Sequence, residues 1–257
     1  MALKDGGVSL TIDGSAATVT FSRPPLNALD QSRIMALEER LRDASRRREI
    51  KLIALAAQGE DFCCGTDIAQ HRPGEVDSLI RLFHSLIRLL FTIEVPTVAL
   101  VQGRALGGGA EIALSCDFIF AETTASFGFP EIRLGIFPPV ASVLLERRVG
   151  RTKAADLILC GAAMSAEAAE RRGLINALVN PGDLINALDT MRDRLEPFSA
   201  STLRLAKRAL VTGAAGDPLS ALAAVEKTYL NDLMRTEDAA EGVSAFLEKR
   251  DPVWKNR

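Results

Sequence analysis

Three short apolar segments, each followed by a turn or loop and then by a helical run, constrain the fold of this chain most strongly. They are LIALAA at 52–57, TVALVQG at 97–103 and DFIFAE at 117–122. Runs of this length and composition are typical of strands that are buried on both faces of a sheet. Because such strands alternate here with helical segments, the sequence predicts an α/β protein with mainly parallel strands.

A β-hairpin and two helices are predicted around these segments. Residues 8–21, VSLTIDGSAATVTF, alternate in polarity around Asp13-Gly14, as two antiparallel strands do. Asp30 is expected to cap the first helix. The apolar face of that helix holds Ile34, Leu37, Leu41 and Ala44. A longer amphipathic helix is expected at about 75–93.

The last part of the chain is predicted to be nearly all helical from about residue 140 onward. Its longer amphipathic runs extend from 183 to 249. We expect two parts, a core at 1–195 and a helical region at 196–257. The helical region has more apolar faces than a single layer can bury on itself. It is therefore expected either to cover the core or to pack against another subunit.

Composition and charge exclude several classes of protein. The net charge is −2, which leaves no strong field to hold nucleic acid or an anionic membrane. The four cysteines form neither a disulfide framework nor a zinc-binding pattern. The start, MALKDGG, lacks the features of a signal peptide, and no run of about 18 uninterrupted apolar residues is present. We therefore expect a cytoplasmic protein with no nucleic-acid partner, no membrane association and no metal.

The stretch ALGGGAEIALSCD at 105–117 places three glycines directly before a short helix. It lacks the Lys-Ser/Thr ending of a P-loop, and it has Ile112 where a dinucleotide-binding fingerprint needs its last glycine. Two interpretations remain open. The glycines allow either close packing of the helix on a neighbouring strand end or the approach of a ligand oxygen to backbone N–H groups.

A second glycine-bearing turn favours the ligand interpretation. CCGTDI at 63–68 also follows a predicted buried strand. Two such turns from neighbouring strands can direct two N–H groups at one point, which is the geometry of an oxyanion hole.

Acid–base chemistry in this chain is expected to rest on carboxylates. Only two histidines are present: His84 is expected to be a partly buried structural residue, and His71 either lines a pocket or lies on a loop surface. No GxSxG motif is present. Glu111 and Glu131 lie in apolar surroundings, where desolvation raises a carboxyl pKa towards neutrality. The alternatives are a charge at a helix start for Glu111 and a partner in Arg133 for Glu131.

Five segments together resemble the crotonase, or enoyl-CoA hydratase/isomerase, superfamily over essentially the whole chain. The segments are RPPLNALD at 23–30, FCCGTDI at 62–68, ALGGGAEIALSCDFIFA at 105–121, FGFPEIRLGIFP at 127–138 and AFLEKRDPVW at 245–254. Each match is weak alone, but all five occur in the family's order and spacing.

The resemblance implies the crotonase-like spiral of ββα turns, with a helical C-terminal trimerisation region. It implies an acyl-CoA substrate and a homotrimer or homohexamer, with coenzyme A present only as part of the substrate. The backbone N–H groups of Thr66 and Gly108 would bind the thioester oxygen. Glu111 and Glu131 match the two catalytic glutamates of hydratases. Keeping both favours hydration, with Glu131 expected to donate a proton to carbon and Glu111 expected to position the water as base.

The resemblance also implies contacts to the rest of the substrate. The coenzyme A contacts would be Cys64, Gly65, Asp67 and Ile68 at the turn, and Phe246 and Lys249 near the C-terminus. An ordinary helix end explains Phe246 and Lys249 equally well. The acyl pocket would be lined by His71, Phe137, Pro139 and Val140.

Departures from the common family pattern point to an unusual acyl group. Pro25 stands where many members have a lysine near the phosphates, which removes that contact. FPPVASVLLERRVG at 137–150 replaces a glycine-rich segment that borders the acyl pocket, and predicts a bulkier wall. Together with QHRP at 70–73 and the C-terminal ending, these features resemble the cyclohexa-1,5-diene-1-carbonyl-CoA hydratases. Those enzymes form 6-hydroxycyclohex-1-ene-1-carbonyl-CoA.

Alternative functions on the same scaffold remain. They are a general 2-enoyl-CoA hydratase, a 3,2-enoyl-CoA isomerase with one proton-shuttling glutamate, and a hydrolase that opens a cyclic acyl-CoA. A non-catalytic RNA-binding relative is a fourth, which the glutamate pair and the acidic balance disfavour.

Overall fold

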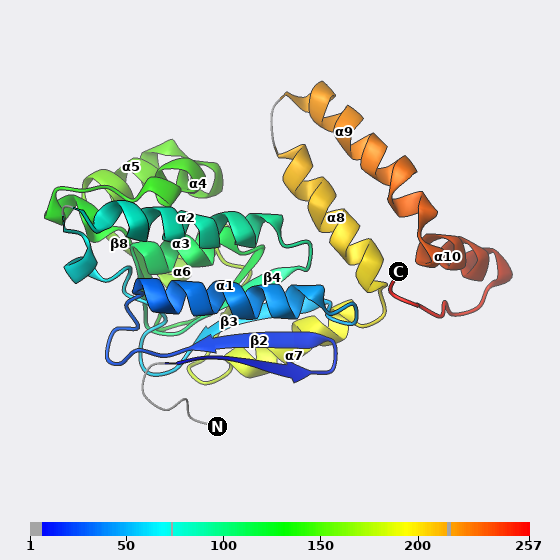
Figure 1. The fold of residues 1–257 in the computed structure, drawn as a ribbon, viewed down its shortest axis with the longest axis horizontal. Coiled ribbons are helices and arrows are strands. Elements are labelled where there is room, and N and C mark those ends of the chain that lie inside the picture. Colours follow the sequence, from blue (N-terminus) through cyan, green and yellow to red (C-terminus); the bar gives the residue numbers. More distant parts are fainter. Residues whose placement is uncertain (1–6, 73, 215–216) are drawn as a thin grey trace.

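The computed structural model describes residues 7–72, 74–214 and 217–257 (Figure 1). Apart from Gly7, the segment MALKDGG lies outside the described residues, and so does Pro73 of the QHRP segment. Within the described part of the chain, no helix is both long enough and apolar enough to cross a membrane.

A six-stranded sheet forms the centre of the protein. Its strand order is β1-β2-β3-β4-β6-β9, with β1 and β2 antiparallel and every later pair parallel. Its strands are β1 Val8–Asp13, β2 Ala16–Phe21, β3 Leu52–Ala57, β4 Thr97–Val101, β6 Phe118–Glu122 and β9 Ala177–Val179. The predicted hairpin and the mainly parallel sheet are confirmed.

The apolar runs of the sheet are explained by burial on both faces. In β3, Ile53 and Leu55 point into a core shared with the helices that follow, whereas Leu52 and Ala54 point to the opposite face. The helix α7, Leu184–Leu195, covers that opposite face with Leu188 and its neighbours. A strand buried on both sides has no polar face to display, which is why its sequence does not alternate.

The first helices form where the sequence predicts them. α1 spans Gln31–Arg46, and the Asp30 carboxylate accepts a hydrogen bond from the Arg33 N–H at its start. All four residues of its predicted apolar face are buried. α2 spans Val76–Thr92 and packs against α1 (Figure 1).

A smaller, three-stranded sheet was not predicted. It consists of β5 Arg104–Leu106, β7 Ser126–Gly128 and β8 Ala163–Ser165, in the order β5-β7-β8. The expectation of nearly continuous helix after residue 140 is wrong at β8 and at β9. These three-residue strands are too short to show a period, and they form because tertiary contacts place them side by side.

The remaining helices of the core are short. They are α3 Gly108–Ser115, α4 Pro139–Val149, α5 Arg151–Leu159 and α6 Ala166–Arg171, with 3₁₀ turns at Ile68–Gln70 and Pro130–Leu134. Ser165 caps α6 by accepting a hydrogen bond from the Ala168 N–H, as its sequence indicates.

The C-terminal helices extend away from the sheets (Figure 1). They are α8 Ala200–Gly213, α9 Pro218–Asn231 and α10 Glu237–Glu248, with a 3₁₀ turn at Leu233–Arg235. Lys207 anchors α8 to the body, since its buried ammonium contacts the Asp117 carboxylate at 2.7 Å and donates to the Val95 carbonyl at 3.1 Å. The predicted boundary at 195/196 falls at the end of α7.

The apolar faces of this region stay exposed in the single chain. The exposed side chains include Leu210, Leu219, Leu222, Phe246 and Leu247. Of the two arrangements expected from the sequence, a cover over the core does not describe α9 and α10. Packing against another subunit, and with it the homotrimer or homohexamer, stays a prediction.

Candidate active site

The turn that contains Thr66 is held against the loop before α1. The Leu29 N–H donates to the Gly65 carbonyl at 2.8 Å, and the Asp67 N–H donates to the Leu29 carbonyl at 2.8 Å. Thr66 lies between these two bonds, and its own N–H donates to no protein acceptor in the described part of the chain. Gly65 has φ +103°, a conformation that favours glycine.

At each of the three consecutive glycines, a side chain would meet a different neighbour. Gly107 has φ +51°, and a Cβ there would press on the Glu131 carboxylate. A Cβ on Gly109 would lie 2.7 Å from the Cys63 carbonyl carbon and overlap its oxygen. Gly109 therefore serves close packing. Gly108 begins α3, and a Cβ there would lie 3.4 Å from the Thr66 nitrogen.

The N–H groups of Thr66 and Gly108 consequently lie side by side. A Cβ built on Gly65 would lie 3.7 Å from the Gly108 nitrogen, which shows the same proximity from the other side. Within the described residues neither N–H has a protein acceptor. The partial positive charge at the N-terminus of α3 adds to the attraction for an anion at this point. Two unpaired donors at one place are what an oxyanion hole requires.

Glu111 is a residue of α3, and its buried carboxylate contacts the start of a different helix, α4. It belongs to the first turn of α3 and is only 3% exposed. Its Oε1 accepts hydrogen bonds from the Val140 N–H at 2.8 Å and the Ala141 N–H at 2.9 Å, at the N-terminus of α4. Burial raises the pKa of Glu111 to about 7, and the nearby Glu131 charge adds to the rise, while the two N–H donors oppose it. Glu111 is therefore poised to exchange a proton near neutral pH.

Glu131 approaches the same point from the 3₁₀ turn Pro130–Leu134. Its Oε1 lies against Gly107, the residue before Gly108. Its Oε2 is buried and has no hydrogen-bond partner among the described residues. Burial raises the pKa of Glu131 above its ordinary value. Arg133 instead donates to the Gly161 carbonyl at 3.1 Å.

His71 lies beside the Thr66 turn and is half-buried. Its Nδ1 is 3.1 Å from the Asp67 carbonyl oxygen, and its Nε2 is 3.4 Å from the Thr66 hydroxyl oxygen. A carbonyl oxygen can only accept, so Nδ1 carries the proton and donates to it. In the neutral ring, Nε2 then accepts from the Thr66 hydroxyl. His84 is partly buried, as expected, and its Nε2 has no described partner.

The predicted acyl-pocket residues of the α4 segment have different surroundings. Phe137 is 64% exposed in the loop before α4. Pro139 is the first residue of α4, and Val140 packs into the main core while its N–H holds Glu111. Their contact with an acyl group stays a prediction. The backbone role of Val140 and Ala141 was missed, although the Pro-Pro pair before a helical run was its signal.

Phe246 and Lys249 are not brought to the glutamates within one chain. Phe246 is 82% exposed on α10, and Lys249 caps that helix with φ 57°. α10 packs against α8 and the 3₁₀ turn Leu233–Arg235, away from the sheets (Figure 1). A role for these two residues in binding coenzyme A therefore stays a prediction that depends on a neighbouring subunit.

Two other features of the molecule do not compete with this site. A groove of about 970 Å³ between β6, β9 and α7 is lined by none of the predicted site residues. We place the chemistry at the glutamates because buried carboxylates and unpaired donors converge there and not in the groove. All four cysteines are free thiols, and no cluster of three or more His, Cys, Asp or Glu side chains in the described residues is arranged to hold a metal.

Comparison with known proteins places the chain in a family. Residues 11–257 match the model of the enoyl-CoA hydratase/isomerase family. The chain belongs to this family. It is 36% identical to the cyclohexa-1,5-dienecarbonyl-CoA hydratase of Thauera aromatica, over 97% of this chain and 96% of that protein. It is 34% identical to the short-chain-enoyl-CoA hydratase of Clostridium acetobutylicum, over 97% and 98%.

Solved structures support the same assignment. The crystal structure of an enoyl-CoA hydratase from Mycobacterium smegmatis matches with a TM-score of 0.89 and 29% identity, over 96% of this chain and 98% of that one. The crotonase fold and the enzyme class predicted from the sequence, a hydro-lyase, are confirmed.

Gly109→Ala tests the close-packing role of the third glycine. Because the new methyl group would overlap the Cys63 carbonyl, we expect the free energy of unfolding in urea to fall by about 3 kcal/mol. Gly213→Ala on α8 is the control, since among the described residues outside its own helix the nearest atom to a Cβ there is 4.0 Å away. Equal stability of the two variants would contradict this packing.

Glu111→Gln tests the raised pKa without substrate, since an amide oxygen can accept both N–H bonds. The native state holds the Glu111 proton more tightly than the unfolded state does. The free energy of unfolding of the unmodified protein should therefore fall relative to the variant as pH rises from about 4.5 to 7. The difference should be on the order of 3 kcal/mol. A difference that does not change with pH, measured by urea unfolding at pH 5 and pH 8, would refute the shift.

Proposed function

We propose that this protein adds water to a carbon–carbon double bond conjugated with the thioester of an acyl-CoA. The observation that carries the proposal is that the buried Glu111 and the half-buried Glu131 lie close to two unpaired backbone donors. A conjugated thioester accepts water only if negative charge can develop on its oxygen. The N–H groups of Thr66 and Gly108 would bind that oxygen, each contributing about 3 kcal/mol to the transition state.

The two carboxylates are suited to opposite halves of the proton chemistry. Glu111 would take a proton from water as the water oxygen bonds to carbon, because two N–H donors stabilise its ionised form. Glu131 would donate its proton to the carbon that becomes enolate-like. Its buried Oε2 has no partner among the described residues, and burial raises the pKa of this carboxyl. One proton passes from water to Glu111 and one from Glu131 to carbon, so the net charge of the pair does not change. Transfer of a proton from Glu111 to Glu131 then restores the starting protonation state of each glutamate.

The substrate that we favour is cyclohexa-1,5-diene-1-carbonyl-CoA, with 6-hydroxycyclohex-1-ene-1-carbonyl-CoA as product. The similarity to the Thauera aromatica enzyme supports this choice. So does the replacement of the glycine-rich segment after Glu131 by one that begins α4 with Pro139, since a stiffer wall suits a rigid ring. A linear 2-enoyl-CoA is the second candidate, supported by the Clostridium acetobutylicum relative.

The wider arrangement of the enzyme follows from the same proposal. Coenzyme A would enter as part of the substrate, with no other cofactor, and its adenine end would contact the turn after Cys63 and residues of a neighbouring subunit. We propose that Phe246 and Lys249 supply that contact across a homotrimer or homohexamer. The exposed apolar side chains of α9 and α10 support such an assembly. A cytoplasmic location and the absence of a nucleic-acid partner remain part of the proposal.

Activity on two substrates tests the proposal. The purified protein is given cyclohexa-1,5-diene-1-carbonyl-CoA or crotonyl-CoA, and loss of the conjugated absorbance and product mass are followed. We expect a gain of one water, mainly on the cyclic diene. Glu111→Gln and Glu131→Gln should each lower kcat by about 10²- to 10⁴-fold, because each removes one proton-transfer group.

Glu146→Gln is the matched control for these variants. It makes the same substitution on the outer side of α4, where Glu146 pairs with Arg151 in solvent, and activity should not change. Water gained by crotonyl-CoA alone would move the protein to the linear enoyl-CoA hydratases. A product of unchanged mass would point to the isomerase, and release of free acid by ring opening would point to the hydrolase.

A further inference from the structure

We propose that Arg23 is a positioning residue for the oxyanion hole, because its guanidinium ties the turn that carries Thr66 to the loop that sets the direction of the Thr66 N–H. The inference rests on the proposed function, since it concerns the same thioester oxygen. Arg23 itself would not touch the substrate.

The direction of the Thr66 N–H depends on its neighbours. Thr66 forms an isolated parallel bridge with Leu29, in which Gly65 and Asp67 make both hydrogen bonds. Cys64 adds a third bond, from its N–H to the Leu26 carbonyl at 2.9 Å. These hydrogen bonds to segment 26–29 therefore hold the turn in place. A shift of the segment relative to the turn would rotate the unpaired Thr66 N–H.

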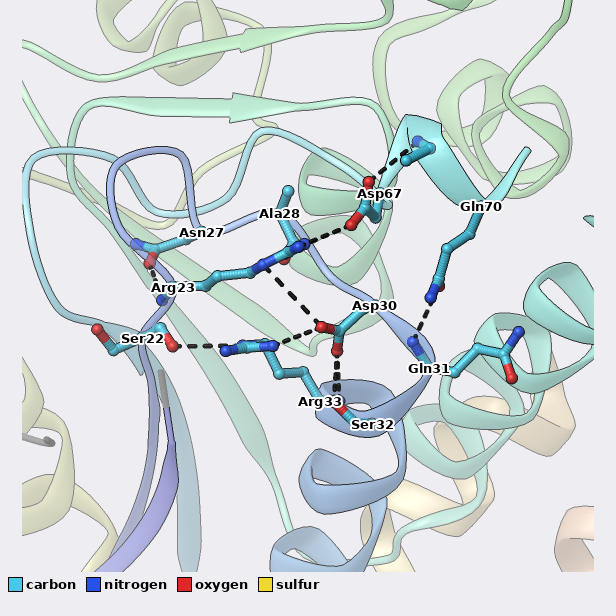
Figure 2. Close-up of polar contacts among 11 residues, drawn as sticks. Ser22, Arg23, Asn27, Ala28, Asp30, Gln31, Ser32, Arg33, Asp67 and Gln70 are labelled. Carbon is cyan, nitrogen blue, oxygen red and sulfur yellow. Dashed lines mark hydrogen bonds and ion pairs between the residues drawn. The ribbon is translucent and has the colours of Figure 1, made fainter. Parts of the chain in front are cut away.

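Arg23 makes contacts on both sides of this pairing. Its Nη1 donates to the Ala28 carbonyl at 3.1 Å, and its Nη2 donates to the Asp67 Oδ2 at 2.7 Å. Figure 2 shows the guanidinium lying between these two partners. The other Asp67 oxygen accepts from the Ala69 N–H, which fixes the carboxylate in the turn. One planar group thus joins the residue before Leu29 to the residue after Thr66.

The loop around Arg23 is itself rigidly bonded. The Arg23 N–H donates to the Asn27 Oδ1 at 2.6 Å, and the Asn27 side-chain amide donates to the carbonyls of Gln58 and Asp61, both at 2.7 Å. The guanidinium therefore extends from a fixed base. Its hydrogen bond to Asp67 also holds the pKa of that carboxyl below its ordinary value, so the carboxylate stays ionised at neutral pH.

A lysine at position 23 cannot make both of these contacts. A guanidinium presents donors in a rigid, planar fork, whereas an ammonium is a single point charge on a flexible chain. Arg23→Lys keeps the charge but loses the simultaneous reach to Ala28 and Asp67. Asp67→Asn keeps the shape but loses the charge of the acceptor. Both changes leave the glutamates, Thr66 and Gly108 in place.

Arg33 supplies a matched control in the same cluster. It pairs with Asp30 and donates to the Ser22 carbonyl, and Figure 2 shows it on the α1 side, away from Asp67. Arg33→Met removes a full charge from the same cluster, which is a larger electrostatic change than Arg23→Lys makes, and the partners of Arg33, Asp30 and Ser22, lie outside the Thr66 turn. It therefore separates a specific effect on the turn from a general effect of charge on the loop.

The experiment combines kinetics with a direct measure of the oxyanion hole. kcat and KM for the preferred acyl-CoA are measured for Arg23→Lys, Asp67→Asn, the double variant and Arg33→Met. The same four changes are then made in a Glu111→Gln/Glu131→Gln parent, which binds crotonyl-CoA labelled with ¹³C at the thioester carbonyl. Isotope-edited infrared spectra of the bound label report how strongly its oxygen is hydrogen-bonded.

We expect Arg23→Lys and Asp67→Asn each to lower kcat by about 10- to 100-fold, because a small misplacement of a transition-state donor has an effect of this size. KM should be little changed in Arg23→Lys, whose side chain does not touch the substrate. The double variant should lose no more than either single variant, since both break one contact. The carbonyl stretch, lowered in the parent, should return towards its value in solution in both variants. Arg33→Met should match its parent throughout.

An unchanged kcat, an unchanged carbonyl stretch, additive losses or an equal loss in Arg33→Met would each overturn the role of Arg23. If Arg23→Lys does not fold, Asp67→Asn decides, and failure of both to fold would mean that the pair supports the whole fold. A parent that shows no lowered stretch would instead contradict the oxyanion hole of the proposed function, whatever the variants do.

Discussion

The close approach of the N-terminus of α3 to the turn at Cys63–Asp67 is the constraint on which the site depends. Gly109 allows it, because any side chain there would overlap the Cys63 carbonyl. The approach brings the Gly108 N–H beside the Thr66 N–H, and it directs Glu111, three residues after Gly108 along α3, into the interior. The close-packing interpretation of the triple glycine is therefore correct at Gly109, and the ligand interpretation stays a prediction for Gly108.

Burial and hydrogen bonds from a helix N-terminus shift the pKa of a carboxyl group in opposite directions. Removing Glu111 from water raises its pKa, while the N–H groups of Val140 and Ala141 stabilise its charge, and the balance lies at about 7. Glu131 has burial without such donors at its Oε2. The pKa of both carboxyls is raised, but their surroundings differ, and such a difference is what an acid and a base in one site need.

Much of the fold and of the site could be predicted from the sequence, because the signals are local. The runs at 52–57 and 97–103, the Asp30 cap and the two glutamates are visible in single segments. The small sheet was missed because β5, β7 and β8 are only three residues each. The bonds from the α4 backbone to Glu111 and from Arg23 to Asp67 join segments that are far apart in the sequence, and no local pattern records them.

The most direct test of the central claim is a crystal structure with a bound, unreactive acyl-CoA. The claim is that the N–H groups of Thr66 and Gly108 receive the thioester oxygen between the two glutamates. The account predicts that this oxygen lies about 2.7–3.1 Å from both nitrogens, with the acyl carbons facing the carboxylates of Glu111 and Glu131. A thioester bound elsewhere, or one whose oxygen contacts neither N–H, would contradict it.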